Sequence, residues 1–277
     1  MKKILLTGAN GMFGQDFQYL AKEKGYEVIP TDIHNLDITD FEAVKDFFGK
    51  NNCDIVVHAA AYTNVDGAEE NKELAFKING TGTENLAKIT AGIGIPIVYI
   101  STDYVFDGTK NIPYIPSDKT NPQSVYGTSK LAGEIAVQKH NPRHYITRTS
   151  WLYGRNGKNF VNTMISLAEK MPELKVVDDQ IGCPTWTYDL GGGILKIINQ
   201  GMPYGIYHVC GSGNTTWYGF TKKILEIANI KTKVDPCTTE EFPRPAKRPA
   251  YSVMDNGGLC QNWEKSLKQY LDMLLFN

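Results

Sequence analysis

The chain has 277 residues, of which 42% are hydrophobic and 21% charged, and its formal net charge is -1. This balance is typical of a globular protein with one large core, and the near-neutral charge argues against nucleic-acid binding, which usually needs a basic excess. The five cysteines form no CxxC pair, and the sequence has neither a secretory leader nor an 18-residue apolar run. We therefore expect a cytoplasmic protein that binds neither nucleic acid nor membrane.

Strands and helices are predicted to alternate along the first 150 residues. The predicted strands are short apolar runs at 3–7, 26–31, 54–58, 97–100 and 145–148, and the predicted helices between them are 12–24, 40–50, 72–92 and 124–140. Such alternation predicts an α/β fold with a Rossmann-type, doubly wound parallel sheet that carries helices on both faces.

The second part of the chain is less regular. We expect residues 1–150 to form a dinucleotide-binding domain and residues 151–277 to form mostly a smaller, interleaved substrate-binding lobe. Part of 175–200, with a strand at 175–177 and a helix at 187–199, is expected to join the sheet of the first domain. The segment 231–255 is rich in Pro, Lys and Arg and is expected to be a loop.

A glycine-rich turn follows the first predicted strand. Its glycines are Gly8, Gly11 and Gly14, and they allow a tight turn and the close approach of a pyrophosphate to the N-terminus of the next helix. The spacing is one residue longer than the usual dinucleotide fingerprint, so a plain loop is the competing interpretation. The position between the first strand and the first helix favours the cofactor site.

Acidic residues follow the second predicted strand. Asp32 can accept hydrogen bonds from the adenosine ribose and repel a 2′-phosphate, although an exposed turn aspartate is the alternative. Asp37 and Ile38 are second candidates to border the adenine. Because no arginine lies nearby, we predict that NADH is preferred over NADPH.

Tyr126 and Lys130 lie four residues apart on a predicted helix and therefore share one of its faces. A nearby ammonium favours the ionised tyrosine and lowers its pKa from about 10, and the same ammonium can hold the nicotinamide ribose. Thr102 follows the fourth strand, at the edge where open α/β sheets bind ligands. A surface pair is the alternative for Tyr126 and Lys130 alone, but with Thr102 they predict a ketone reductase in which the tyrosine donates the proton.

Together these features resemble the extended short-chain dehydrogenases/reductases and, more closely, the dTDP-4-dehydrorhamnose reductase family. The resemblance is carried by residues 59–66, 101–108, 126–134, 148–154 and 179–185. It implies an NAD(P)H-dependent reduction of the C4 keto group of a nucleotide sugar, dTDP-4-dehydro-L-rhamnose (dTDP-6-deoxy-L-lyxo-4-hexulose), to dTDP-L-rhamnose.

The resemblance also implies individual contacts. Those to the cofactor are Gly11, Met12, Phe13, Asp37, Ile38, Ala59, Ala60, Ala61, Tyr62 and Thr63, and those to the substrate are Thr102, Asp103 and Trp151. Met12 and Phe13 depart from the Gln-Val pair that is common in the family. Trp151 taken alone is a core tryptophan, and Arg244 and Arg248 are either solvated charges or ligands of the substrate diphosphate. The histidines show no metal-ligand spacing, so we predict no metal.

Two other functions compete with this interpretation. Sugar dehydratases and epimerases belong to the same superfamily, but a dehydratase would carry an Asp-Glu pair where this chain has Asp103 and Tyr104. A non-catalytic protein similar to the regulatory subunit of methionine adenosyltransferase is the alternative from another class, and the set of Thr102, Tyr126 and Lys130 argues against it. The oligomeric state is open, with a homodimer as one candidate.

Overall fold

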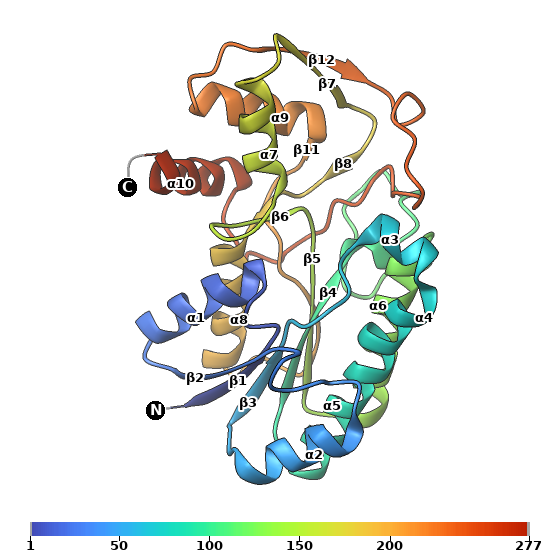
Figure 1. Cartoon of the computed structure of the whole chain (residues 1–277), viewed down its shortest axis with the longest axis vertical. Helices are drawn as coiled ribbons and strands as arrows, with labels where there is room; N and C mark the ends of the chain where they lie inside the picture. The colour runs from blue at the N-terminus through green and yellow to red at the C-terminus, as the bar shows by residue number, and fades with distance from the viewer. Residues whose placement is uncertain (1, 276–277) are drawn as a thin grey trace.

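The computed structural model of the chain describes residues 2–275. Its larger body is built on a six-stranded parallel sheet with the strand order β10-β5-β4-β3-β1-β2 (Figure 1). The strands are β1 (Lys3–Thr7), β2 (Glu27–Thr31), β3 (Ile55–His58), β4 (Ile97–Thr102), β5 (His144–Thr149) and β10 (Gly205–His208). The predicted doubly wound sheet is confirmed, and its strand order reverses between β1 and β3, where such sheets bind ligands.

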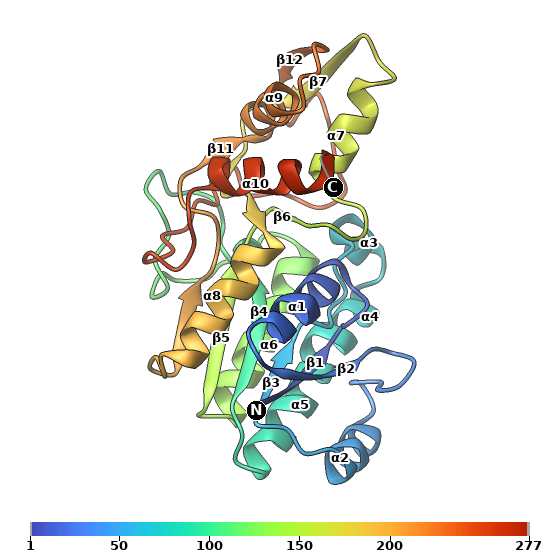
Figure 2. The same ribbon diagram turned by 90° about the vertical axis from the view of Figure 1, so that its left-hand side faces the viewer.

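Helices cover both faces of this sheet because the side chains of each strand alternate in direction. In β1, Ile4 and Leu6 pack in the core shared with α1 (Met12–Glu23) and α8 (Thr187–Asn199), which lie together in Figure 2. Leu5 points the other way, into the core shared with α2 (Phe41–Lys50), α5 (Thr83–Gly92) and α6 (Val125–His140).

The predicted helix at 72–92 is interrupted by a wider turn. It consists of α4 (Lys72–Phe76), a π-helical turn η1 (Lys77–Gly82) and α5, and it follows the short helix α3 (Val65–Glu70). Single π-helical turns inside α-helices are frequent at functional sites.

A smaller lobe lies beyond the carboxyl ends of the strands, at the top of Figure 1. Its helices are α7 (Phe160–Ala168), α9 (Trp217–Ile227) and α10 (Trp263–Leu275), which pack on an aromatic core that includes Tyr153, Phe220 and Trp263. Three two-stranded sheets complete it: β7 (Glu173–Val177) with β12 (Lys233–Cys237), β6 (Leu152–Tyr153) with β9 (Thr185–Trp186), and β8 (Ile181–Gly182) with β11 (Thr215–Thr216).

Two expectations for the second part of the chain are wrong. The strand at 175–177 belongs to β7, which pairs with β12 because Leu174 and Val176 bury in the core of the smaller lobe. The expected loop at 231–255 is wrong only for Lys233–Cys237, which form β12, because no other helix or strand lies in that segment. The sixth strand of the main sheet is instead β10, and α8, the predicted helix at 187–199, packs on α1. A domain division at residue 150 stays a prediction.

Within residues 2–275, no helix is both long enough and apolar enough to span a membrane. The five cysteines are all unpaired thiols.

Candidate active site

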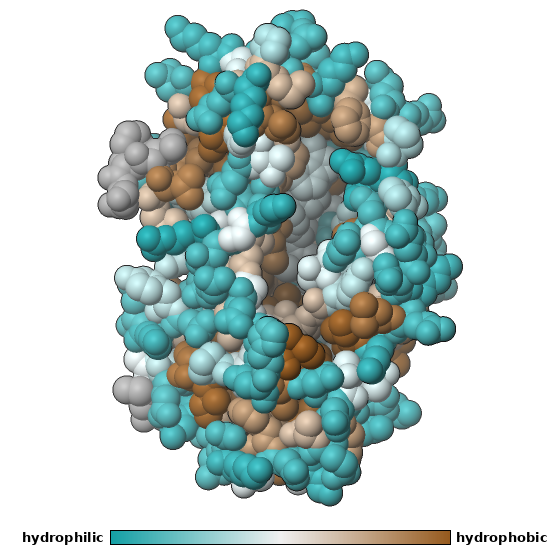
Figure 3. All heavy atoms as spheres, in the orientation of Figure 1, coloured by the Kyte–Doolittle hydropathy of each residue, from teal (hydrophilic) through white to brown (hydrophobic). Residues whose placement is uncertain are grey.

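A cavity of about 920 Å³ opens at the carboxyl ends of the main-sheet strands. Figure 3 shows it as a hollow between the main body and the smaller lobe. Its lining begins at the glycine turn after β1, passes the segments after β2, β3 and β4, and ends at Trp151 and Leu152. A cavity of this size at the point where the strand order reverses is the expected place for a dinucleotide and its substrate.

The glycine turn leaves backbone N–H groups free at the start of α1. Gly8 has a φ of +68°, and a Cβ built on Gly14 would lie 2.2 Å from the Gly8 carbonyl oxygen, so neither position accepts a larger residue without rearrangement. Gly11 caps the helix without a side-chain hydrogen bond, and no acidic residue stands in the first turn. This end of α1 therefore fits the pyrophosphate of a dinucleotide.

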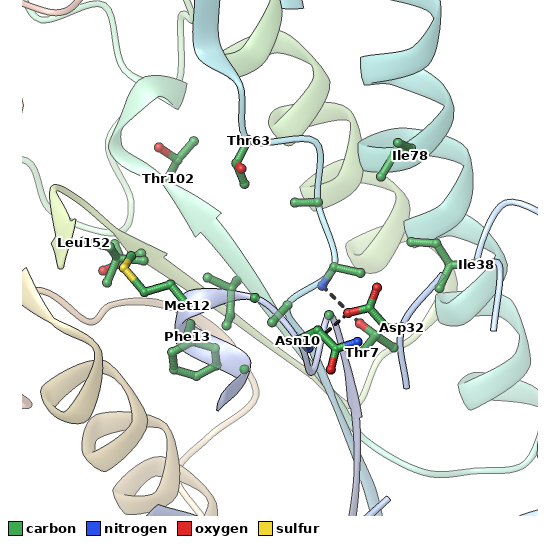
Figure 4. Close-up of a pocket in the computed structure, with 18 of the residues that line it drawn as sticks. Thr7, Asn10, Met12, Phe13, Asp32, Ile38, Thr63, Ile78, Thr102 and Leu152 are labelled. Carbon is green, nitrogen blue, oxygen red and sulfur yellow. Dashed lines mark hydrogen bonds between the residues drawn. The ribbon is translucent and has the colours of Figure 1, made fainter. Parts of the chain in front are cut away.

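The far end of the cavity is acidic. Asp32 Oδ2 accepts a hydrogen bond of 3.0 Å from the Asn10 N–H, as Figure 4 shows, and its other oxygen accepts one from the Ile33 N–H. Asp37 lies beside it, and hydrogen bonds from the Thr39 N–H and hydroxyl lower its pKa. Among the described residues that line the cavity, none is Lys, Arg or His. A 2′-phosphate finds no cation on this wall.

Thr102 and Tyr126 both line the cavity, and their side chains are hydrogen-bonding neighbours. Thr102 ends β4, accepts a hydrogen bond of 3.2 Å from the Tyr104 N–H and donates one of 3.0 Å to Asp103. Tyr126 is in the first turn of α6, which begins where Ser124 caps the Gly127 N–H. The Tyr126 ring lies edge-on to the Tyr104 ring at 5.6 Å between centroids. Both hydroxyl-bearing side chains therefore belong to the lining of one cavity.

The expected lowering of the Tyr126 pKa is wrong for this structure. Burial raises the pKa of Tyr126 to about 12, although a hydrogen bond with Thr102 opposes the shift. The Lys130 ammonium is directed elsewhere: it donates to the Ile100 carbonyl at 2.7 Å and lies 4.1 Å from the centroid of the Tyr99 ring. Burial lowers the pKa of Lys130 to about 7. Desolvation therefore outweighs the pairing that the spacing predicts.

Asp103 is a buried carboxylate whose surface is 2% exposed. Its Oδ2 has no hydrogen-bond partner, and burial raises the pKa of the carboxyl group to about 6. A buried unpartnered oxygen costs free energy unless a ligand satisfies it. Asp103 lines the cavity beside Thr102, and contact of its carboxylate with a bound hydroxyl group stays a prediction.

Trp151 lies where the main body passes into the smaller lobe, and the structure supports parts of both interpretations. Its indole stacks on Trp217 with centroids 3.5 Å apart and packs against the aromatic core, yet it also lines the cavity. Its φ of 47° is unusual for a non-glycine residue. A Cβ on Gly182 would lie 2.5 Å from the Trp151 ring, which explains the glycine in the 179–185 segment.

Four candidate site residues do not line the cavity: Lys130, Tyr62, Arg244 and Arg248. Lys130 lies behind the lining. The Arg248 guanidinium binds Asp66 with two hydrogen bonds of 2.9 and 3.0 Å. Contact of Arg248 with a diphosphate stays a prediction, as do the ligand contacts of the lining residues. No group of three metal-ligating side chains occurs within the described chain.

Sequence reasoning missed Asn79, which is fully buried in the π-helical turn. Its amide accepts from the Tyr62 N–H at 2.8 Å and donates to the Tyr62 carbonyl and to the Ser129 hydroxyl. Ser129 in turn donates to the Tyr126 carbonyl. Asn79 thus ties the segment after β3 to the helix that carries Tyr126.

A profile of the family described as RmlD substrate binding domain matches residues 1–275. A dTDP-4-dehydrorhamnose reductase of Sinorhizobium fredii is 39% identical over 290 residues, which cover 99% of this chain and 98% of the relative. The solved dTDP-4-dehydrorhamnose reductase of Clostridium acetobutylicum is 49% identical with a TM-score of 0.96, covering 98% of this chain and 99% of its own.

The Bacillus anthracis dTDP-4-dehydrorhamnose reductase, solved in complex with NADP, is 40% identical with a TM-score of 0.95 and covers 99% of this chain and 100% of its own. Such identity along whole chains agrees with the glycine turn, the Thr102–Tyr126 pair and the two-body architecture described above. The chain belongs to the dTDP-4-dehydrorhamnose reductase family.

Proposed function

We propose that the protein reduces the C4 keto group of dTDP-4-dehydro-L-rhamnose to a hydroxyl group, giving dTDP-L-rhamnose. The observation that carries the proposal is that the neighbouring side chains of Thr102 and Tyr126 line a cavity that reaches back to the glycine turn. The names of the full-length relatives supply the identity of the sugar.

The chemistry divides between the cofactor and the chain. A bound nicotinamide dinucleotide supplies the hydride. The Thr102 hydroxyl, turned from Asp103, donates its proton to the ketone oxygen in a hydrogen bond and fixes the position of that oxygen. Tyr126 keeps its proton at neutral pH because its pKa is raised to about 12, and it donates that proton to the oxygen as negative charge develops there. Lys130 holds the ribose of the cofactor when its side chain turns from the Ile100 carbonyl.

The preferred cofactor in this proposal is NADH. The carboxylates of Asp32 and Asp37 stand on the cavity wall without a lining cation, which disfavours a 2′-phosphate. The NADP complex of the Bacillus anthracis relative shows that a family member binds the phosphorylated cofactor, and it gives the NADH preference no support. Measured affinities for both cofactors decide this part of the proposal.

The substrate side of the proposal assigns two lining residues. Asp103 accepts a hydrogen bond from a sugar hydroxyl through its unpartnered oxygen, and Trp151 packs against the sugar. Arg248 is a ligand for the diphosphate if the substrate draws it from Asp66. A homodimer and a cytoplasmic location complete the proposal, the latter supported by the unpaired cysteines.

The test is the stoichiometry of cofactor oxidation. Purified protein is mixed with the 4-keto sugar and a limiting amount of NADH, and absorbance reports NADH consumption. A reductase oxidises one NADH for each sugar reduced. Sugar turnover without net NADH consumption would instead identify an epimerase or dehydratase, and binding of both ligands without turnover would favour the non-catalytic alternative.

A further inference from the structure

A buried ion pair lies directly behind the Thr102–Tyr126 pair. Glu134 accepts hydrogen bonds from Arg148 Nε at 2.9 Å and Nη2 at 2.7 Å, and the two side chains are 1% and 2% exposed. The other ion pairs within residues 2–275 expose at least a fifth of each side chain. Because burying two charges costs desolvation energy, a buried pair is weak evidence for stability and calls for another reason.

The neighbours of this pair are parts of the proposed catalytic machinery. Glu134 lies one helical turn beyond Lys130 on α6, so the two side chains share a face. Its Oε1 also accepts a hydrogen bond of 2.5 Å from the Ser101 hydroxyl. Ser101 stands in β4 between Ile100, whose carbonyl binds Lys130, and Thr102. Glu134 therefore joins the helix that carries Lys130 to the strand end that carries Thr102.

Arg148 completes the connection from the neighbouring strand. It lies on β5 opposite Ser101 in the parallel register, so the Glu134 carboxylate bridges α6 to two adjacent strands. The Arg148 guanidinium also packs 5.0 Å from the centroid of the Phe106 ring and donates to the Pro116 carbonyl. These contacts hold the carboxylate in one orientation.

We propose that Glu134 is a positioning residue for the reduction. Its carboxylate holds Lys130 and Thr102 at a constant separation and keeps a negative charge near the lysine ammonium. The inference rests on the proposed ketone reduction, in which Lys130 and Thr102 act, and it adds a residue that does not line the cavity.

The charges around Lys130 agree with this role. His58 on β3 is neutral because burial and the Lys130 charge lower its pKa to about 3. Tyr99 on β4 and Tyr126 on α6 are uncharged at neutral pH because burial raises the pKa of each phenol. Glu134 supplies the negative charge that opposes the desolvation of Lys130 and raises its pKa. Arg148 offsets part of this charge, but it faces Glu134 from the side of β5.

The first variant is Ser101→Ala, which removes one hydroxyl and leaves the ion pair intact. We expect kcat to fall about 10-fold, because small displacements of reacting groups are costly, while KM for the sugar changes little. The matched control is Ser266→Ala, which removes a buried serine of the smaller lobe that donates to the Asp189 carboxylate on α8 and does not line the cavity. Equal losses of kcat in the two variants would overturn the proposal.

The second variant replaces both charges, Glu134→Leu with Arg148→Met, because buried pairs replaced by apolar side chains of similar volume usually leave a folded protein. Loss of the Glu134 charge lowers the Lys130 pKa, so the pH above which kcat declines should fall by about one unit. The pH dependence of NADH affinity, followed by fluorescence, should shift in the same direction.

Wild-type turnover decides the proposed function separately. If the wild type does not reduce the sugar, that function fails, and the pH dependence of NADH affinity in the variants still tests Glu134. Wild-type kcat and an unshifted pH profile in the double variant would overturn the positioning role. If the double variant does not fold, the comparison of Ser101→Ala with Ser266→Ala decides alone.

Discussion

Replacing Tyr126 by phenylalanine removes the proposed proton donor and almost nothing else. The tyrosine ring is half-buried and packs edge-on against Tyr104, contacts that a phenylalanine ring keeps. With its pKa raised to about 12, the wild-type hydroxyl is protonated at pH 7 in about 10⁵ molecules for each ionised one. We therefore expect the variant to bind NADH normally and to lose the proton-transfer contribution.

The expected loss in kcat is roughly 10²–10⁴-fold, the usual range for a positioned acid, which corresponds to about 3–5 kcal/mol in the activation free energy. The assay follows NADH absorbance under saturating sugar, with NADH affinity measured separately by fluorescence. Tyr104→Phe is the matched control, because it removes a second phenol hydroxyl from the lining of the same cavity and should cost less than 10-fold. Wild-type kcat in Tyr126→Phe would refute the assignment.

Three further substitutions test the cavity. The pKa of Asp103 in the folded protein, about 6, exceeds its usual 3.8, so burying this carboxylate destabilises the fold above pH 6 and not below about pH 4. Asp103→Asn should thus raise the free energy of unfolding near pH 7.5 by up to roughly 3 kcal/mol, leave it nearly unchanged near pH 4, and lower kcat/KM. Calorimetry that shows no difference in stability between wild type and variant at either pH would contradict this. Wild-type protein should bind NADH at least as tightly as NADPH, and Asp32→Ala should shift the ratio of the two affinities toward NADPH. Parallel titrations that show a clear NADPH preference unchanged by the substitution would exclude Asp32 as the residue that selects the cofactor. Gly182→Ala should lower both the Tm and the affinity for the sugar, because its Cβ would lie 2.5 Å from the Trp151 ring and overpacking costs about 1–3 kcal/mol. The control Gly192→Ala, whose Cβ would meet nothing within 4 Å, should change neither the Tm nor the sugar affinity.

Local patterns in the sequence predicted the first five strands, the glycine turn and the helix that carries Tyr126 and Lys130, because each depends on neighbours within a few residues. Pairing between strands that are far apart in the sequence could not be predicted from such local patterns. The strand at 175–177 has the same apolar character whether it joins the main sheet or pairs with β12, and only the burial of Leu174 and Val176 separates the two outcomes.

Parts of the site were hidden for related reasons. Asn79 looks like an ordinary helical residue in sequence, and only the π-helical turn shows that its amide holds Tyr62. Arg248 looks free in a Pro-rich segment, yet its partner Asp66 lies 182 residues earlier in the chain. The pKa of Tyr126 depends on how deeply the folded chain buries it, which spacing does not encode.

The most direct test of the account is to identify the product. The protein is incubated with dTDP-6-deoxy-L-lyxo-4-hexulose and NADH, and the sugar is analysed by NMR. The account predicts one equivalent of NADH oxidised and a product with the C4 configuration of dTDP-L-rhamnose. A product with the opposite C4 configuration, or unchanged sugar in the presence of protein that binds NADH, would contradict it.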